Sequence, residues 1–445
     1  MFIKVCVSLV LFMVVPAWSQ VAPSATGGGP GSDADTRMLQ PPPVSGEAYP
    51  TTFGSEGRSN YLTAGIRLDT AYVDNVLAGS TSKPVGDVTY SIGPSIALNQ
   101  TTPRQVRSLT YSPGFTFYQP TSQLDAVDQN GKLDYEFRLR PYTTMSIRDS
   151  FVESSSVFNQ PNPLSEGGVS GSPQPSTASV IAPFAKQITN IVTAGISHQV
   201  SKDAMIGGGG VFELLHYLNP SQAQGLSDST SSGGSAFFNR RLSSTQYLGV
   251  AYQFAHILAS PQNAQSETLT NTILPFYTIY LNSSTSLSLS CGLEHINASE
   301  SLLPTYSSWS PIAMASFGWH ASRANFATSY SRAIVAGGGI LGAYNANTAN
   351  ASFGWQIAHS WTTGLGAAYS NLKNATPLLS QGVPGGSGVS GSASIQHPMG
   401  EHLVVSFEYE RLHQSFSGIQ VISEEPDTDR ESISLSYQLR RPLGR

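Results

Sequence analysis

Charged residues are scarce in this sequence. They make up 11% of the 445 residues, where about 25% is ordinary for a soluble protein. A soluble chain of this length needs more charge than that to cover its surface. The net charge of −5 is also small. The balance of acidic and basic residues therefore gives no reason to expect nucleic acid or an anionic membrane surface as a partner.

Cysteine and long apolar runs are scarce as well. The only cysteines are Cys6 and Cys291, and Cys6 lies in the apolar start of the chain. Once that start is removed, no internal disulfide can form. After residue 20, no stretch approaches the ~20 apolar residues of a membrane-spanning helix. These absences exclude a disulfide-stabilised exported domain and a helical membrane protein.

The first residues have the pattern of a Sec signal peptide. Lys4 supplies the positive region, residues 5–15 form an apolar core, and Pro16 ends it. Ala17 and Ser19 place small residues three positions and one position before a cut that precedes Gln20. The other interpretation, a membrane anchor, needs a longer apolar run. We therefore expect a signal peptide over 1–19.

Residues 20–57 show neither a strand period nor a helix period. They are rich in Pro, Gly and Ser, as in GGGPGS and QPPPVSGE. Such composition cannot bury a core and predicts a disordered periplasmic segment. A short tether or partner-binding motif is the alternative.

From residue 58 onwards, apolar residues alternate with polar ones. The clearest segment is KLDYEFRLR, residues 132–140, in which every apolar side chain falls on one face and every charge on the other. About eighteen segments of this kind follow one another, although 16 remains open because 232–242 and 268–278 are poorly patterned. Strands of ~10 residues tilted by ~40° match the apolar band of a transmembrane barrel.

The connections between these segments alternate in length. Short ones are expected near 140–142, 201–203, 242–245, 280–284, 320–323, 358–360 and 397–402. Long ones are expected near 74–86, 119–131, 153–186, 217–231, 257–267, 296–308, 334–346, 371–388 and 414–428. Short periplasmic turns and long external loops are typical of outer-membrane barrels. The sequence thus predicts an all-β fold, with residues 58–445 forming a closed antiparallel transmembrane β-barrel.

Three local motifs carry a family resemblance: Ala71-Tyr72-Val73-Asp74-Asn75, Ile92-Gly93-Pro94-Ser95-Ile96 and Leu109-Thr110-Tyr111-Ser112-Pro113. With the strand pattern, they make the chain resemble porin-like bacterial outer-membrane barrels, and among these the barrels associated with exopolysaccharide and surface-sorting systems. The resemblance covers 58–445 as a pattern and 58–160 more closely. It departs at the C-terminus, where Arg440-Arg441 follows the last strand instead of a terminal aromatic residue.

The resemblance also implies partners and a location. It implies residence in the cell outer membrane of a Gram-negative bacterium, contact with the lipid bilayer and lipopolysaccharide, and insertion by the barrel-assembly machinery. It further implies passage of small hydrophilic solutes or of polysaccharide. No cofactor is implied.

Residue patterns for catalysis or metal binding are weak. The nine histidines are scattered, and none is spaced with a serine nucleophile motif. Adjacent Glu294 and His295 point to opposite faces, which argues against a catalytic pair. The acidic run 424–429 has oxygen ligands that could hold Ca²⁺, but a solvated external loop is the favoured interpretation. The glycines at 207–210 lack a phosphate-loop context and suggest room in the lumen or a bend.

The residues expected on the lumen-facing side of the strands are the best indication of function. Most of their residues are small and polar, which leaves a wet lumen, and 16 to 18 strands enclose an aqueous channel. Charge concentrates on three expected strands. The candidate pore-lining charges are Arg67, Asp69, Lys132, Asp134, Glu136, Arg138 and Arg148. They could select solutes or act only as salt bridges that stabilise the wall. Of the adjacent Arg240 and Arg241, only one can face inward.

These observations predict a passive channel for small hydrophilic solutes or a polysaccharide-associated pore. The alternative is a structural or adhesive barrel with a plugged lumen, in which loop 153–186 has a role. An outer-membrane lipase or protease is disfavoured.

Overall fold

The computed structural model describes residues 60–77, 84–102, 104–154, 185–219, 226–260, 266–300, 303–337, 340–358, 360–375, 385–416 and 427–443. The expected signal peptide and the 20–57 segment lie outside these residues, and so does most of loop 153–186. No helix in the described part of the chain is long and apolar enough to cross a membrane.

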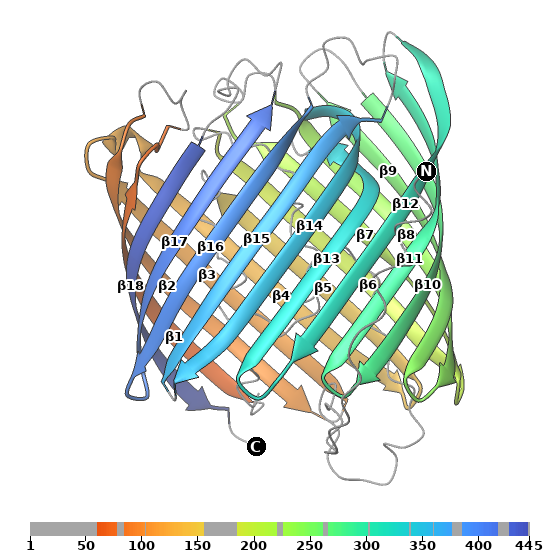
Figure 1. Cartoon of the computed structure of the whole chain (residues 1–445), viewed down its shortest axis with the longest axis horizontal. Helices are drawn as coiled ribbons and strands as arrows, with labels where there is room; N and C mark the ends of the chain where they lie inside the picture. The colour runs from red at the N-terminus through yellow and green to blue at the C-terminus, as the bar shows by residue number, and fades with distance from the viewer. Residues whose placement is uncertain are drawn as a thin grey trace, which may run out of the picture.

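Eighteen strands form one closed antiparallel sheet (Figure 1). They are β1 (Tyr61–Val73), β2 (Asp87–Thr102), β3 (Gln105–Tyr118), β4 (Ala126–Arg140), β5 (Thr143–Ser154), β6 (Gln187–Ser201), β7 (Ala204–Tyr217), β8 (Asp228–Ser243), β9 (Gln246–Ser260), β10 (Ser266–Asn282), β11 (Thr285–Glu300), β12 (Leu303–His320), β13 (Ala324–Gly337), β14 (Ile340–Ala358), β15 (Trp361–Asn374), β16 (Gly386–Met399), β17 (Leu403–Phe416) and β18 (Asp427–Pro442). A 3₁₀ turn, η2 (Ser122–Leu124), lies between β3 and β4. The predicted barrel and the count of eighteen are confirmed, and the two poorly patterned segments are β8 and β10.

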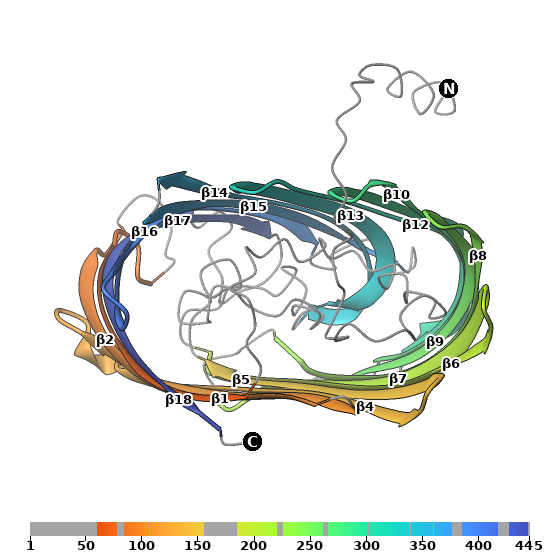
Figure 2. The same ribbon diagram turned by 90° about the horizontal axis from the view of Figure 1, so that it is seen from below.

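The first and last strands close the ring. β1 pairs with β2 on one side and with β18 on the other, the latter from Tyr61/Pro442 to Val73/Arg430. Closure satisfies backbone groups that an open sheet would leave unpaired in hydrocarbon. Seen along its axis, the ring is flattened rather than round (Figure 2).

Alternation sets which side chains face lipid. On β1, Ile66, Leu68 and Tyr72 are exposed, whereas Asp69 and Ala71 are buried on the inner side. The same period-2 pattern exposes large apolar residues on strand after strand. The outer face is therefore apolar, which in a closed barrel is the lipid-facing surface.

Four tyrosines on the outer face lie at equivalent positions, each six residues from the first residue of β3, β9, β13 or β17. Each hydroxyl donates a hydrogen bond to an amide or carboxylate oxygen on the next strand. The pairs are Tyr111–Gln129 (3.3 Å), Tyr252–Asn271 (2.6 Å), Tyr330–Asn347 (3.1 Å) and Tyr409–Asp429 (2.7 Å). Tyrosine suits a membrane interface, because its ring is apolar and its hydroxyl is hydrated. We call these four pairs the external girdle.

Connections at the opposite end are short. Every link from an even-numbered strand to the next odd-numbered strand spans two or three residues, such as 141–142 and 400–402. β1 begins and β18 ends at this same end, which is the periplasmic end. The link 103–104 between β2 and β3 is an additional short turn that the sequence patterns did not indicate.

Several predicted external loops are shorter than expected. The 119–131 connection ends at residue 125, because β4 begins at Ala126. The 257–267 connection reduces to 261–265. The predictions of long loops at 296–308 and 334–346 are wrong, because β11 to β14 continue until only 301–302 and 338–339 separate them. These extensions lack clean alternation because they leave the membrane band and pack against protein.

The motif residues of β2 and β3 interrupt their ladder. Pairing stops between Ile92/Phe115 and Ile96/Tyr111. Pro94 and Pro113 lie within this gap, and proline has no backbone N–H to donate to a neighbouring strand. The two motifs thus mark a local break in the wall.

Candidate functional site

Charged residues of β17, β18 and β1 form one cluster on the inner face. Arg430 donates to Asp69 and to Glu410, each at 2.9 Å. Arg67 lies 3.4 Å from Asp69 and 3.8 Å from Glu408. Glu410 and Arg430 are direct cross-strand partners, and Asp69 is reached across the closure between β18 and β1. We call these five residues the closure cluster.

A second inner cluster joins β4 and β5. Asp134 and Arg148 are register partners whose charged atoms lie 3.4 Å apart. Lys132, two residues along β4, places its ammonium 3.9 Å from the same carboxylate. Glu136 and Arg138 lie further along the same face of β4, toward the periplasmic turn. We call Lys132, Asp134 and Arg148 the β4–β5 cluster.

Three of the four cations in the two clusters are more accessible than the carboxylates, whereas Arg430 is 11% exposed and its partner Glu410 is 18% exposed. The side chains of Arg67, Lys132 and Arg148 are 35%, 34% and 42% exposed. Those of Asp69 and Glu408 are each 5% exposed, and Asp134 is 20% exposed. The most accessible charges along this wall are therefore the basic groups of Arg67, Lys132 and Arg148.

The wall between the two clusters carries small polar side chains. The inner faces of β2 and β3 contribute mainly Ser, Thr and Gly, for example Ser91, Gly93, Ser108 and Thr110. The hydroxyls of Ser91 and Thr116 bond to each other across the two strands at 3.0 Å. These short side chains take up little space in front of this part of the wall.

The opposite part of the inner face is packed. On β10, the side chains of Thr268, Thr270, Thr272 and Thr278 are all buried. Near the periplasmic end, Met205 and Tyr247 are buried together, with Phe237 and Tyr280 against them. This side of the interior therefore differs in packing from the wall formed by β2 and β3.

The glycine run of β7 does not leave open room in the lumen. A side chain at Gly207 would meet the ring of Phe237, its register partner on β8. Gly249 and Phe276 form a second pair of the same kind. The aromatic rings fill the space that the glycines leave and cover their backbone. The prediction of free space at Gly207 is thus corrected.

Three members of the closure cluster were missed from the sequence. Glu408 and Glu410 alternate with Phe407 and Tyr409, so the signal for inward charge was present on β17. Arg430 was harder to find, because it follows an acidic run assigned to a loop. In the structure, Asp427 and Asp429 of that run belong to β18 and pair with Arg411. The rest of the run, 424–426, lies outside the described residues.

The other residues singled out from the sequence are placed as follows. Arg241 faces inward and binds Asp203 of the periplasmic turn at 2.9 Å, so Arg240 faces outward. His295 faces outward beside Ser307 and Trp309, whereas Glu294 is buried on the inner side. Among the described residues, no three His, Cys, Asp or Glu side chains are grouped to hold a metal ion.

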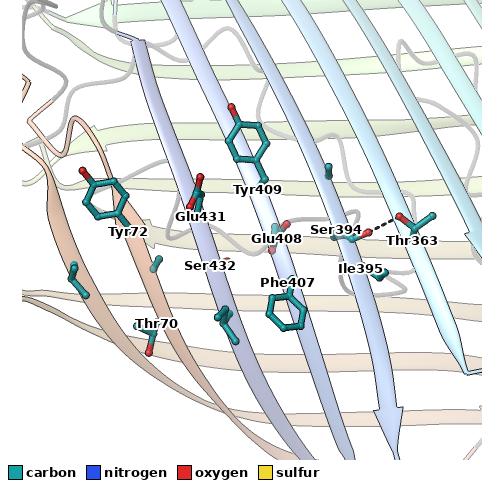
Figure 3. Close-up of a pocket in the computed structure, with 14 residues that line it drawn as sticks. Thr70, Tyr72, Thr363, Ser394, Ile395, Phe407, Glu408, Tyr409, Glu431 and Ser432 are labelled. Carbon is teal, nitrogen blue, oxygen red and sulfur yellow. Dashed lines mark hydrogen bonds between the residues drawn. The ribbon is translucent and has the colours of Figure 1, made fainter.

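A groove of about 690 Å³ lies on the outer face over β1, β2 and β15 to β18. Tyr72, Glu431 and Tyr409 lie in a row across its external part, and Phe407 lies below Tyr409 along β17 (Figure 3). These three are register partners across β1, β18 and β17. Most of the lining side chains point away from the lumen, so this groove faces lipid and is not a path for solutes.

The closed sheet, its apolar exterior and its polar interior define the chain as a transmembrane β-barrel of the outer membrane. No family model matches the sequence, and no curated protein matches it.

Solved structures that resemble it are outer-membrane barrels. Pseudomonas aeruginosa OpdK with vanillate aligns at 8% identity and a TM-score of 0.40, covering 85% of this chain and 99% of that one. Acinetobacter baumannii OccAB4 aligns at 9% identity and 0.40, covering 86% and 99%. Pseudomonas aeruginosa OccK2 (OpdF) with glucuronate aligns at 9% identity and 0.41, covering 85% and 98%. Similarity this low transfers neither a ligand nor a function.

Proposed function

We propose that this barrel is a passive channel for small hydrophilic solutes, with pore-lining charge supplied by the candidate residues of β1, β4 and β5. One observation carries the proposal: the inner side chains of Arg67, Lys132 and Arg148 are more exposed than the carboxylates that they contact. A wall built only for stability gains nothing from keeping cations exposed to water, since exposed ion pairs contribute little to stability.

The exposed cations also define a preference. A row of basic groups in a confined aqueous path raises the local concentration of anions and lowers that of cations. We therefore propose that the channel favours small anionic solutes over cationic ones of equal size. Glu136 and Arg138 extend this charged wall along β4 toward the periplasmic end of the barrel.

Purified protein in a planar lipid bilayer tests the proposal. The expected result is a series of stable single-channel steps, with a reversal potential in a salt gradient that indicates anion preference. A bilayer that stays sealed at high protein dose, although the protein is inserted and folded, would overturn the channel function.

A structural barrel with a sealed lumen is the second candidate. The packed inner face of β10 favours it, because four threonines that should line an aqueous path are buried. The sealed bilayer described above is its expected result. Contact with lipopolysaccharide, insertion by the barrel-assembly machinery and a link to polysaccharide systems stay predictions from the sequence.

A further inference from the structure

The wall of the barrel splits between β12 and β13. These strands pair only from Ala313/Arg332 to His320/Asn325. Beyond that point β12 continues to Leu303 paired with β11, and β13 continues to Gly337 paired with β14. The two hairpins β11–β12 and β13–β14 therefore separate at their external ends.

Pro311 accounts for the position of the split. The N–H of His320 donates to Ser284 on the β11 side of β12. N–H groups alternate in direction along a strand, so the N–H groups of the even-numbered residues from 318 down to 310 also point to β11. The backbone nitrogen of Pro311, an odd-numbered residue, therefore points to β13. Proline carries no hydrogen there, so the ladder loses a bond at the first position beyond Ala313 that should supply one.

Beyond the split, the β13–β14 hairpin lies inside the ring. Its outward residues Ile334 and Ala343 pack on Ile296 and Ala298 of the inner face of β11. β14 contacts β9 and β10, which are five and four places away around the ring. Figure 2 shows the β13–β14 ribbon (cyan) leaving the wall and curling into the interior.

Two polar contacts fasten the hairpin in this position. The backbone N–H of Ile334, which has lost β12 as a partner, donates to the buried carboxylate of Glu294 at 3.1 Å. The hydroxyl of Ser310 donates to Asn345 on β14 at 3.1 Å. A buried backbone N–H without an acceptor is costly, so Glu294 replaces the missing strand.

The outer face is polar where the split begins, because Arg332 and its register partner Asn347 follow Tyr330 on the external side. Tyr330, a member of the external girdle, precedes Arg332 by two residues on a strand that runs outward. The free edges of β12 and β13 thus begin just above the girdle, where water can satisfy their backbone groups. The inner hairpin consequently sits at the external mouth and not at the middle of the lumen.

The inner surface of the hairpin reaches toward the far wall. Tyr344 and Ala346 are buried with Leu372 and Phe416, and Leu226 packs against this group. Leu226 also packs against Ala185, Leu215 and Tyr217 at the external ends of β6 and β7. A continuous apolar bridge therefore runs from β14, β15 and β17 through Leu226 to β6 and β7.

We propose that the inward end of the β13–β14 hairpin is the element that sets the size limit of the external mouth. The hairpin and Leu226 close the mouth over β8 to β13, where the inner face is packed. Solutes are left with the passage along β17, β18 and β1 to β5, where the accessible cations lie. This inference rests on the proposed channel function and adds to it the structure that excludes large solutes.

Shortening the hairpin tests the inference. Residues 334–345 are replaced by Asn-Gly, a sequence suited to a two-residue turn between the register partners Ala333 and Ala346. We expect a severalfold rise in single-channel conductance and entry of neutral sugars that the intact protein excludes in liposome swelling. Unchanged conductance and an unchanged size limit in a folded variant would overturn the inference.

A point variant tests the fastening without removing the hairpin. Glu294→Ala removes the acceptor of the Ile334 N–H, so we expect larger and noisier conductance steps. Glu294→Gln keeps an acceptor oxygen and should behave as the intact protein does. His295→Ala, on the adjacent outward face, is the matched control. Equal conductance of the Ala and Gln variants would contradict the role of Glu294.

A cross-link separates failure of this inference from failure of the channel function. Cysteines at Ser310 and Asn345, in a Cys291→Ser background, should form a disulfide whether or not the protein conducts, because the native side chains touch. A disulfide that forms in a protein with no conductance would leave the hairpin in place and refute the channel. Failure to form the disulfide in a conducting protein would refute the hairpin placement alone.

Discussion

Arg430 on the last strand donates a hydrogen bond to Asp69 on the first strand at 2.9 Å. The two residues are 361 positions apart in the chain, and they meet because β18 and β1 close the ring. Arg430 also holds Glu410 at 2.9 Å. The guanidinium thus balances carboxylates from both of the strands that flank β18.

Removal of this cation should weaken the closed barrel. Arg430→Ala removes the cation that Asp69 and Glu410 share and leaves Asp69 only the longer contact with Arg67. Breaking a buried pair from one side costs about 3 kcal/mol or more. Urea unfolding of the refolded protein, followed by tryptophan fluorescence, measures the loss. Arg411→Ala removes an exposed pair with Asp427 on the outer face and should change the midpoint little. Equal midpoints for the two variants would contradict the role of Arg430 in closure.

Charge selection should depend on the accessible cations of the β4–β5 cluster. Lys132→Gln combined with Arg148→Gln leaves Asp134 as the local charge, so the reversal potential in a salt gradient should move toward cation preference. Arg240→Gln, which removes an outward charge, is the control and should leave the potential unchanged. If the double variant keeps the ion selectivity of the intact protein, Lys132 and Arg148 only form salt bridges that stabilise the wall.

Glycine at position 207 should be required for packing. An alanine methyl group there would overlap the Phe237 ring and approach the Ile196 carbonyl oxygen to 2.8 Å. Overpacking of this kind costs about 1–3 kcal/mol. Gly207→Ala should therefore lower the urea midpoint, whereas Gly210→Ala, whose nearest neighbour is a carbonyl oxygen at 3.4 Å, should have a smaller effect. A larger loss from the second variant would contradict this packing.

The two faces of β5 should differ in their tolerance of charge. Ile147 faces lipid beside Tyr135, and Ser146 faces the lumen opposite Glu136. An arginine exposed to lipid near the bilayer midplane costs about 2–4 kcal/mol. Ile147→Arg should thus reduce the folded fraction in vesicles, whereas Ser146→Arg gains a nearby carboxylate and should fold. The opposite order would invert the assignment of inside and outside.

Local sequence was sufficient for the barrel but not for its mouth. The alternation in 132–140 placed the charges of β4 on one face, and the structure puts them inside. The same rule applied to β17 would have found Glu408 and Glu410. Arg430 escaped because an acidic run resembles a loop, although its aspartates pair with Arg411 across the outer face. The external parts of β11 to β14 escaped because they contact protein on both faces and lose the two-residue period.

By itself, the sequence determined that the chain forms a large transmembrane barrel, how its side chains divide between lipid and lumen, and at which end its turns are short. These properties follow from a period of two residues, which each strand carries within its own segment. Only the tertiary structure decided that Arg430 reaches Asp69, that Phe237 covers Gly207, and that Ile334 leaves the wall to rest on Glu294. Those contacts depend on register and curvature around the ring, and no single strand encodes the position of its neighbours.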